Sequence, residues 1–232
     1  MSSVLISEKA NPGMVSYLTS MGHTPIYIRG TSVVHEAISS HVDIYCCLIG
    51  EELVIAPEQL NLIEAQLILA GVPYLKGASD LKPAYPGDIA YNAAVTGKYF
   101  IHHLKHTDPV LLDRARNQGL TLIDAKQGYT KCNLVVVTEN ALITSDEGIA
   151  AQLTPYPIAV LLVQPGHVNL PGFASGFLGG ASGRVDDTII FNGNLAMHPD
   201  CKQIISFIEA HGLKVAYFQG FELEDIGSIV AL

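Results

Sequence analysis

The feature that most constrains the fold is a recurring segment, in which a β-rich run follows an amphipathic stretch and ends in glycine. "IYIRG", "PYLKG" and "YFQG" are examples. Five glycines end such segments: Gly30, Gly77, Gly128, Gly166 and Gly220. They are spaced by 47, 51, 38 and 54 residues, and counting from the last through the C-terminus and on from the N-terminus reaches the first after 42 residues. Five similar lengths tile the chain when it is read as a circle, which predicts internal repetition.

Each interval contains the same order of predicted elements, ββαβ. First strands such as "DIYCCLI" and "KCNLVVV" lead through tight turns into second strands such as "LVIA" and "ALITS". A stretch with apolar residues spaced about 3.6 apart follows, as in "PEQLNLIEAQLILAG", and a third strand then runs to the glycine. Pro109 and Pro199 fit the first turns of two of these helices.

The fifth unit is split, with "IGSIVAL" at the C-terminus as its first strand and "SVLIS" near the N-terminus as its second. We therefore predict a single α/β domain over residues 1–232, folded as a closed five-fold ββαβ propeller. Pairing of the two terminal strands would leave no open sheet edge. A generic α/β chain with chance glycines would explain the elements but not their shared order.

Composition indicates a globular chain with a substantial core. Apolar residues make up 49% of the 24.8 kDa chain, and charged residues make up 15%. No apolar run is longer than that of residues 158–163, which is far shorter than the roughly 20 residues of a membrane span. The first residues lack the basic and apolar regions of a signal peptide, so we expect a cytoplasmic protein.

Charge and cysteine usage argue against several classes of partner. The net charge is −9 and the basic residues are scattered singly, which disfavours nucleic acid. The four cysteines form no C-x-x-C pair, so neither a zinc site nor a disulfide framework is predicted, and no cofactor is expected. The adjacent Cys46 and Cys47 would point to opposite sides of a strand, and we expect all four thiols to be reduced.

The five-unit arrangement resembles the pentein fold, the α/β propeller of the guanidine-modifying enzymes and of the non-enzymatic ribosome anti-association factor. The stretches "GKYFIHH", "KQGYTKCNLVVV" and "SGFLGGASGRVDD" also look like those of a bacterial branch of that superfamily with no assigned activity. The resemblance covers the whole chain and rests on architecture. It implies a small-molecule site at the mouth of the propeller, or a protein-binding surface.

Polar residues follow the second strands, at equivalent positions that would converge around the axis of a propeller. They are His102, His103, Ser145, Asp146 and Asn192. Helix starts follow them, and helix N-termini favour anions, so these residues are candidate ligand-binding residues. Ser145, Asp146 and Asn192 are equally suited to be helix caps and turn formers.

The expected starts of two first strands carry a second polar group, "AYNAA" and "YTKCN". The resemblance implies a cysteine thiolate that attacks an amidine carbon, a histidine that moves protons, and carboxylates that hold the guanidinium. Cys132 is the candidate nucleophile, His102 its candidate imidazole, and Asn92 a candidate neighbour.

Three departures separate this chain from the guanidine-modifying enzymes. The stretch taken to match their nucleophile segment is "GGASGRV", which offers Ser182 in place of a cysteine. Their acidic guanidinium clamp has no match, and the His-x-Asp pattern is met only by "HTD" at a helix start. We therefore predict Ser182 only as a ligand-binding residue, on the rim of the propeller mouth that residues 179–182 are expected to form.

Two functions from different classes stay open. One is a small-molecule site, catalytic through Cys132 in a hydrolase or transferase that acts on a guanidine or amide compound. The other is a non-catalytic, protein-binding propeller that resembles the ribosome factor. The glycine-rich stretch 172–183 is either a lid or a backbone that approaches a ligand closely. A deep pocket on the axis would favour the first function.

Overall fold

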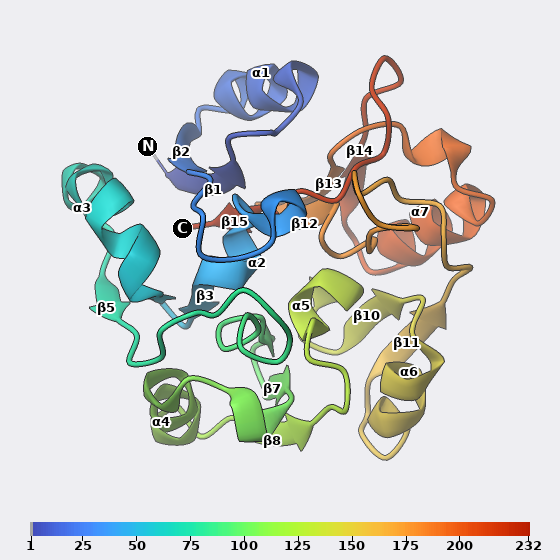
Figure 1. Cartoon of the computed structure of the whole chain (residues 1–232). Coiled ribbons are helices and arrows are strands. Elements are labelled where there is room, and N and C mark those ends of the chain that lie inside the picture. The colour runs from blue at the N-terminus through green and yellow to red at the C-terminus, as the bar shows by residue number, and fades with distance from the viewer. Residues whose placement is uncertain (1) are drawn as a thin grey trace.

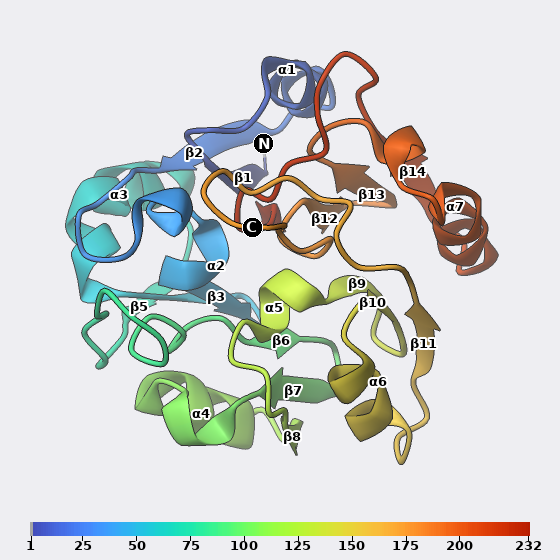
Figure 2. The same cartoon turned by 45° about the vertical axis from the view of Figure 1, so that its right-hand side comes forward.

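The computed structural model describes residues 2–232 and contains five three-stranded sheets. In each sheet the central strand pairs antiparallel with one neighbour and parallel with the other. Figure 1 shows the sheets arranged around a common centre, and Figure 2 shows the same arrangement after a turn. None of the described helices is long and apolar enough to cross a membrane.

The strands occupy three equivalent positions in the sheets. The antiparallel neighbours are β3 (Cys46–Ile49), β6 (Ala94–Val95), β9 (Val135–Thr138), β12 (Ser182–Val185) and β15 (Val230–Ala231). The central strands are β4 (Glu52–Ile55), β7 (Tyr99–His102), β10 (Ala141–Thr144), β13 (Thr188–Phe191) and β1 (Ser3–Ser7). The parallel neighbours are β5 (Tyr74–Lys76), β8 (Thr121–Asp124), β11 (Ala159–Leu162), β14 (Lys214–Ala216) and β2 (Thr24–Ile28). The three sets match the predicted first, second and third strands.

A helix connects the central strand of each sheet to its parallel neighbour, as a parallel connection requires. These helices are α1 (Pro12–Ser20), α3 (Pro57–Ala70), α4 (Pro109–Asn117), α6 (Glu147–Leu153) and α7 (Cys201–Ala210). Pro109 begins α4 as predicted, with Asp108 as the N-cap that accepts from two backbone amides. The prediction for Pro199 was wrong, because α7 begins two residues later, after the N-cap Asp200.

The terminal strands lie side by side. β15 pairs antiparallel with β1, with Val230 opposite Leu5 and Ala231 opposite Val4. The backbone N–H of Leu232 also donates to the carbonyl of Ser3, over 2.9 Å. The sheet β15-β1-β2 therefore has the same pairing pattern as the four sheets built from continuous segments.

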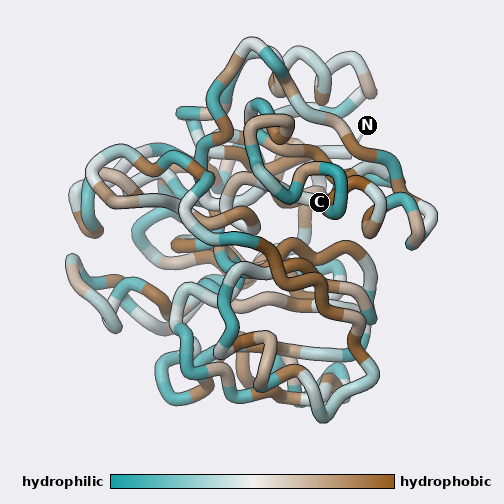
Figure 3. The backbone as a smooth tube through the Cα atoms, turned by 90° about the vertical axis from the view of Figure 1, so that its right-hand side faces the viewer, coloured by the Kyte–Doolittle hydropathy of each residue, from teal (hydrophilic) through white to brown (hydrophobic). Residues whose placement is uncertain are grey.

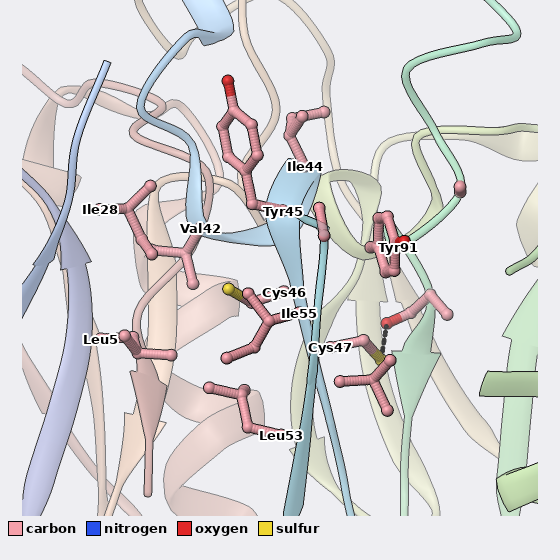
Figure 4. Packing of buried hydrophobic residues seen from close by; sticks show 14 of the residues in the cluster. Leu5, Ile28, Val42, Ile44, Tyr45, Cys46, Cys47, Leu53, Ile55 and Tyr91 are labelled. Carbon is pink, nitrogen blue, oxygen red and sulfur yellow. Dashed lines mark hydrogen bonds between the residues drawn. The ribbon is translucent and has the colours of Figure 1, made fainter. Parts of the chain in front are cut away.

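Apolar residues gather on the strands inside the molecule, while hydrophilic segments mostly follow the outer loops (Figure 3). The central strand β1 is buried along its whole length, whereas its parallel neighbour β2 is partly exposed. Figure 4 shows Leu5 and Ile55 among the buried side chains around β3. Cys46 and Cys47 point to opposite sides of this strand, and the Cys47 thiol contacts the carbonyl of Ala93.

Two short helices lie near the middle of the ring of sheets, α2 (Val42–Tyr45) and α5 (Thr130–Asn133) (Figures 1 and 2). Both stretches were predicted as the starts of first strands, and this was wrong. In each case the chain makes one helical turn before the strand begins, at Cys46 and at Val135. The helical turns bring polar side chains to the centre of the molecule.

Candidate functional site

Asn92 connects the segment before β6 to the start of α5. Its Oδ1 accepts from the backbone N–H groups of Lys131, at 2.8 Å, and Cys132, at 3.3 Å. Its Nδ2 lies 3.1 Å from the Cys132 Sγ. The amide thus satisfies two N–H groups that a helix start leaves free, and it fixes the thiol of Cys132.

Asp43, from α2, reaches the same thiol from another side. Its Oδ2 lies 3.2 Å from the Cys132 Sγ and accepts from the Ser228 hydroxyl over 2.6 Å. The Lys131 Nζ in turn donates to Ser228, over 3.0 Å. A chain of polar contacts therefore runs from Lys131 through Ser228 and Asp43 to Cys132. We call these residues, with Asn92, the central cluster.

The backbone around Ser228 is unusual for a residue with a side chain. Ser228 has φ 75°, in the left-handed region that disfavours any residue with a Cβ. The preceding Gly227 has φ 76°, and a Cβ there would come within 2.2 Å of the Cβ of His41. The Ser228 N–H donates to the carbonyl of Gly180 over 2.6 Å, which holds this conformation. The fold accepts local strain to place this hydroxyl between Lys131 and Asp43.

Burial sets the protonation of the central cluster. Burial raises the pKa of Asp43 and lowers the pKa of Lys131, although each charge favours the other. The pKa of the Cys132 thiol lies well above its usual range, because the side chain is buried and the carboxylates of Asp43 and Asp225 disfavour a second negative charge. Cys132 is therefore a protonated thiol that donates to Asp43.

His41 and Asp225 lie beside the central cluster. Burial lowers the pKa of His41 to about 4, so the imidazole is neutral near pH 7. The Nδ1 of His41 lies 3.7 Å from the Oδ1 of Asp225. Burial raises the pKa of Asp225 to about 6, against the backbone N–H groups of Phe177 and Gly227 that bind its carboxylate. The donor atoms of His41, Asp43 and Cys132 lie within 4.8 Å of one another, a geometry that could hold a metal ion.

Two cavities adjoin this centre. The first, of about 560 Å³, is lined by residues from all five first strands and by Asp43 and Lys131, and we call it the axial cavity. The second, of about 320 Å³, is lined by His41, Asp88, Cys132, Asp225 and aromatic side chains, and we call it the acidic cavity. Different members of the central cluster thus face two separate spaces.

The acidic cavity combines carboxylates with aromatic rings. The Oδ2 of Asp88 accepts from the Tyr129 hydroxyl over 2.7 Å. The Asp88 Oδ1 is buried and has no hydrogen-bond partner among residues 2–232. Tyr85 and Phe173 add aromatic walls. A buried carboxylate oxygen without a donor favours a ligand that brings its own N–H groups.

Of the residues predicted from the sequence, Asn92 and Cys132 meet in the central cluster. Gly179 and Gly180 lie beside it, because the Gly180 N–H donates to the carbonyl of Cys132 and the carbonyl oxygen of Gly179 lies 3.1 Å from the Ser228 hydroxyl. Ser182 is buried at the start of β12 and lines the axial cavity.

The other predicted residues have partners elsewhere. Both ring nitrogens of His102 are engaged, Nδ1 with Thr107 at 2.7 Å and Nε2 with the carbonyl of Gly128 at 3.1 Å. His103 lies 3.7 Å from the carboxylate of Asp124. Two further candidates make hydrogen bonds within the fold. Asp146 caps α6 through the N–H of Ile149, and Asn192 accepts from the backbone and side chain of Asn11; Ser145 is half-buried directly before Asp146.

The sequence interpretation missed Asp43, Ser228, His41, Asp88 and Asp225. A signal for two of them exists, since Asp43 and Ser228 precede first strands, as Asn92 does. Aligning the polar residues before the first strands, rather than after the second strands, would have grouped Asp43, Asn92, Cys132 and Ser228. Asp88 and Asp225 lie in loops, where their spacing carries no such signal.

His102 gives a prediction for acid stability. Burial lowers its pKa to about 3, from 6.5 for an exposed histidine, so the unfolded chain binds its proton first as pH falls. The stabilisation by neutral His102 is complete above 6.5 and is lost progressively toward the folded pKa. His102→Gln should weaken the decline in unfolding free energy between about pH 6.5 and 5 by roughly 2 kcal/mol.

Urea unfolding of both proteins across this pH range measures the difference. Asp225 acts in the opposite direction, because its raised pKa adds stability as pH falls, but it is present in both proteins and cancels. Parallel curves for the variant and the parent would contradict the prediction.

A family model, described as a family of unknown function (DUF6873), matches residues 5–230. The chain belongs to this family. No curated protein matches the chain.

Similar solved structures show the fold of this chain. The chain is similar to a mutant of dimethylarginine dimethylaminohydrolase (DDAH) from Pseudomonas aeruginosa in complex with citrulline, with 10% identity and a TM-score of 0.58. The match covers 99% of this chain and 98% of that chain. An amidinotransferase from Microseira wollei gives 10% identity and a TM-score of 0.56, with 94% and 88% covered. Agmatine deiminase of C. jejuni is 9% identical with a TM-score of 0.54, and the match covers 94% of this chain and 87% of that chain. All three are pentein proteins, and this chain shares their mixed α/β fold.

Proposed function

We propose that this family member is a pentein-type hydrolase or transferase for a small cationic compound that carries a guanidinium or amidine group, with Cys132 as the nucleophile. The observation that carries the proposal is the acidic cavity. It places the Cys132 thiol in one space with Asp225 and with Asp88, whose Oδ1 has no hydrogen-bond donor among residues 2–232. The proposal includes a closed propeller as the fold, in which the pairing of β15 with β1 completes the fifth unit.

The lining of the acidic cavity fits a planar cation. A guanidinium presents N–H groups in a fixed fork that matches a carboxylate, and Asp88 and Asp225 are both buried. Aromatic side chains such as Tyr85, Tyr129 and Phe173 attract a cation through their ring faces. The sequence offered no acidic clamp by motif, and in this proposal the two loop aspartates supply that role.

Substrate binding would also activate the thiol. Two neighbouring carboxylates hold the pKa of Cys132 high, and a cation beside Asp225 opposes their effect and favours the thiolate. Asp43 already accepts from the Cys132 thiol and is the nearest base for its proton. The thiolate would attack the amidine carbon, the carbon–nitrogen bond would break, and the amine would leave with a proton. Water or a second amine would then release the carbon group from sulfur.

The imidazole role in this proposal goes to His41 rather than to His102. His41 lines the acidic cavity with Cys132, and its donor nitrogen lies within 4.8 Å of the thiol sulfur. Both nitrogens of His102 are bonded to Thr107 and Gly128. Ser182, His103, Ser145, Asp146 and Asn192 stay predictions from the sequence as ligand-binding residues.

A thermal-shift panel tests the proposal. Guanidines, amidines and alkylammonium ions should raise the melting temperature, while neutral ureas of the same shape should not. A ligand at 100 times its Kd stabilises the folded state by about 2.7 kcal/mol. Asp88→Asn should abolish the shift, since the amide keeps the shape but loses the charge. Asp113→Asn, at an exposed position on α4, is the matched control and should keep it.

Turnover is tested separately. A guanidine that binds should release an amine or ammonia with the parent protein, and Cys132→Ser should bind the compound without releasing it. Cys201→Ser, on α7, should keep full turnover. Equal stabilisation by neutral ureas, or none by any cation, would overturn the proposal and favour the non-catalytic, protein-binding propeller.

A further inference from the structure

Three residues from two separate segments meet at the edge of the central cluster, and their side chains are of the types that bind metal ions. His41 directly precedes α2, Asp43 lies within α2, and Cys132 lies within α5. Their donor atoms lie within 4.8 Å of one another, and all three side chains are buried. No spacing motif in the sequence connects Cys132 to the other two, because the fold alone brings them together.

Two of the three residues have buried polar atoms without partners. The His41 Nδ1 and the Asp43 Oδ1 have no hydrogen bond to any of residues 2–232. Leaving such a group unsatisfied in the interior destabilises the fold, so most buried polar atoms in folded proteins are paired. A cation held by the three side chains is a partner of the kind that such buried atoms lack.

The donor set selects the kind of ion. Thiolate sulfur and imidazole nitrogen suit zinc and its transition-metal neighbours, whereas magnesium and calcium require shells of oxygen. Three protein ligands leave a fourth position of a tetrahedral ion for water or a small molecule. His41 and Cys132 line the acidic cavity, which therefore adjoins that position.

The charges and the outer contacts also fit an ion. Asp43 and Asp225 are buried carboxyl groups, and the Lys131 Nζ reaches Asp43 only through the Ser228 hydroxyl. A divalent ion would place a positive charge directly beside Asp43, and on binding the ion the Cys132 thiol would release its proton to solvent. Asn92 donates to the Cys132 sulfur and Ser228 donates to the carboxylate of Asp43, contacts that orient metal ligands.

We propose that His41, Asp43 and Cys132 form a binding site for a zinc-like divalent transition-metal ion, with its open position toward the acidic cavity. The site stands on the cluster itself and does not depend on a catalytic role for Cys132. If both proposals hold, the ion and an electrophilic substrate compete for the same sulfur, and the ion acts as a reversible block.

Cobalt(II) titration of the full chain is the first test, because cobalt replaces zinc and reports its ligands. We expect one ion per chain, visible bands of four-coordinate cobalt, and a near-ultraviolet band from thiolate-to-cobalt charge transfer. Cys132→Ser should remove the charge-transfer band and Cys201→Ser should keep it. A band that persists in Cys132→Ser, or the absence of any such band in the parent protein, would overturn the site.

Zinc protection of the parent protein provides a measurement that needs no variant. Zinc should slow alkylation of Cys132 at least tenfold while Cys201 reacts at an unchanged rate, with both sites read by mass spectrometry. Equal Cys132 rates with and without saturating zinc would overturn the site even if the variants fail to fold. Neither the cobalt titration nor the zinc protection uses a guanidine. Failure of the thermal-shift panel therefore leaves the metal site untouched, and failure of the metal experiments leaves the proposed function untouched.

Discussion

Removal of residues 227–232 is expected to destabilise the protein by roughly 5 kcal/mol or more, enough to leave it largely unfolded at 25 °C. The deletion removes β15 from its pairing with β1 and exposes an edge of the sheet. It also removes Ile229, which is 2% exposed and contributes about 1.5–3 kcal/mol by its burial. Finally, it removes the Ser228 hydroxyl, the shortest hydrogen bond to Asp43.

Circular dichroism and urea unfolding of the shortened chain measure this effect. Deletion of Leu232 alone is the matched control, because it removes one backbone hydrogen bond to Ser3 and leaves β15 in place. That control should lose no more than about 1–2 kcal/mol. A chain without residues 227–232 that melts within a degree or two of the parent would show that the terminal pairing contributes little.

Replacement of Asp43 with Ala is expected to cost about 3–5 kcal/mol of unfolding free energy, because it removes the buried carboxylate that Ser228 links to Lys131 and leaves Lys131 with only Asp225 as an acidic neighbour. Lys131→Met alone should cost a similar amount, since it leaves Asp43 and Asp225 without their ammonium. The double variant should cost clearly less than the sum, which defines a coupling energy above about 1 kcal/mol.

Urea unfolding of the four proteins gives that coupling energy. The exposed ion pair of Lys98 and Glu139, at 2.9 Å, provides a control cycle with an expected coupling below about 1 kcal/mol. If the two cycles give equal couplings, Lys131 and Asp43 do not interact more strongly than a pair in water, and the electrostatic description of the central cluster fails.

The repeated elements could be predicted from the sequence because each has a local cause. Helix α3 ends at Ala70 with Gly71 in the left-handed conformation, as the glycine after the apolar stretch indicated. The central strands are continuous apolar runs because both of their faces are covered, which is visible in "SVLIS" and "TIIFN". These signals involve neighbours along the chain and need no knowledge of distant contacts.

The centre of the molecule was harder to predict, because its contacts connect segments far apart in sequence. "YTKCN" was expected to be extended, but Asn92 accepts from the backbone N–H groups of Lys131 and Cys132 and stabilises a helical turn. Asp43 and Ser228 are 185 residues apart, and nothing in the local sequence relates them. His102 has the residue type of a proton carrier, yet its surroundings bury it and engage both nitrogens.

The pairing of β1 with β15 has a consequence for the order of events during synthesis. β1 and its parallel partner β2 are close neighbours in the sequence, but its antiparallel partner is made only when synthesis reaches residues 230–231. Until then one edge of β1 has no strand to bond to, and Asp43 lacks the hydroxyl of Ser228. Contacts between such distant segments form late, because the chain between them must be ordered first. While the residues between β1 and β15 are being made, the nascent protein must therefore keep an apolar strand edge from other chains, which predicts a need for chaperone protection that ends when β15 is released.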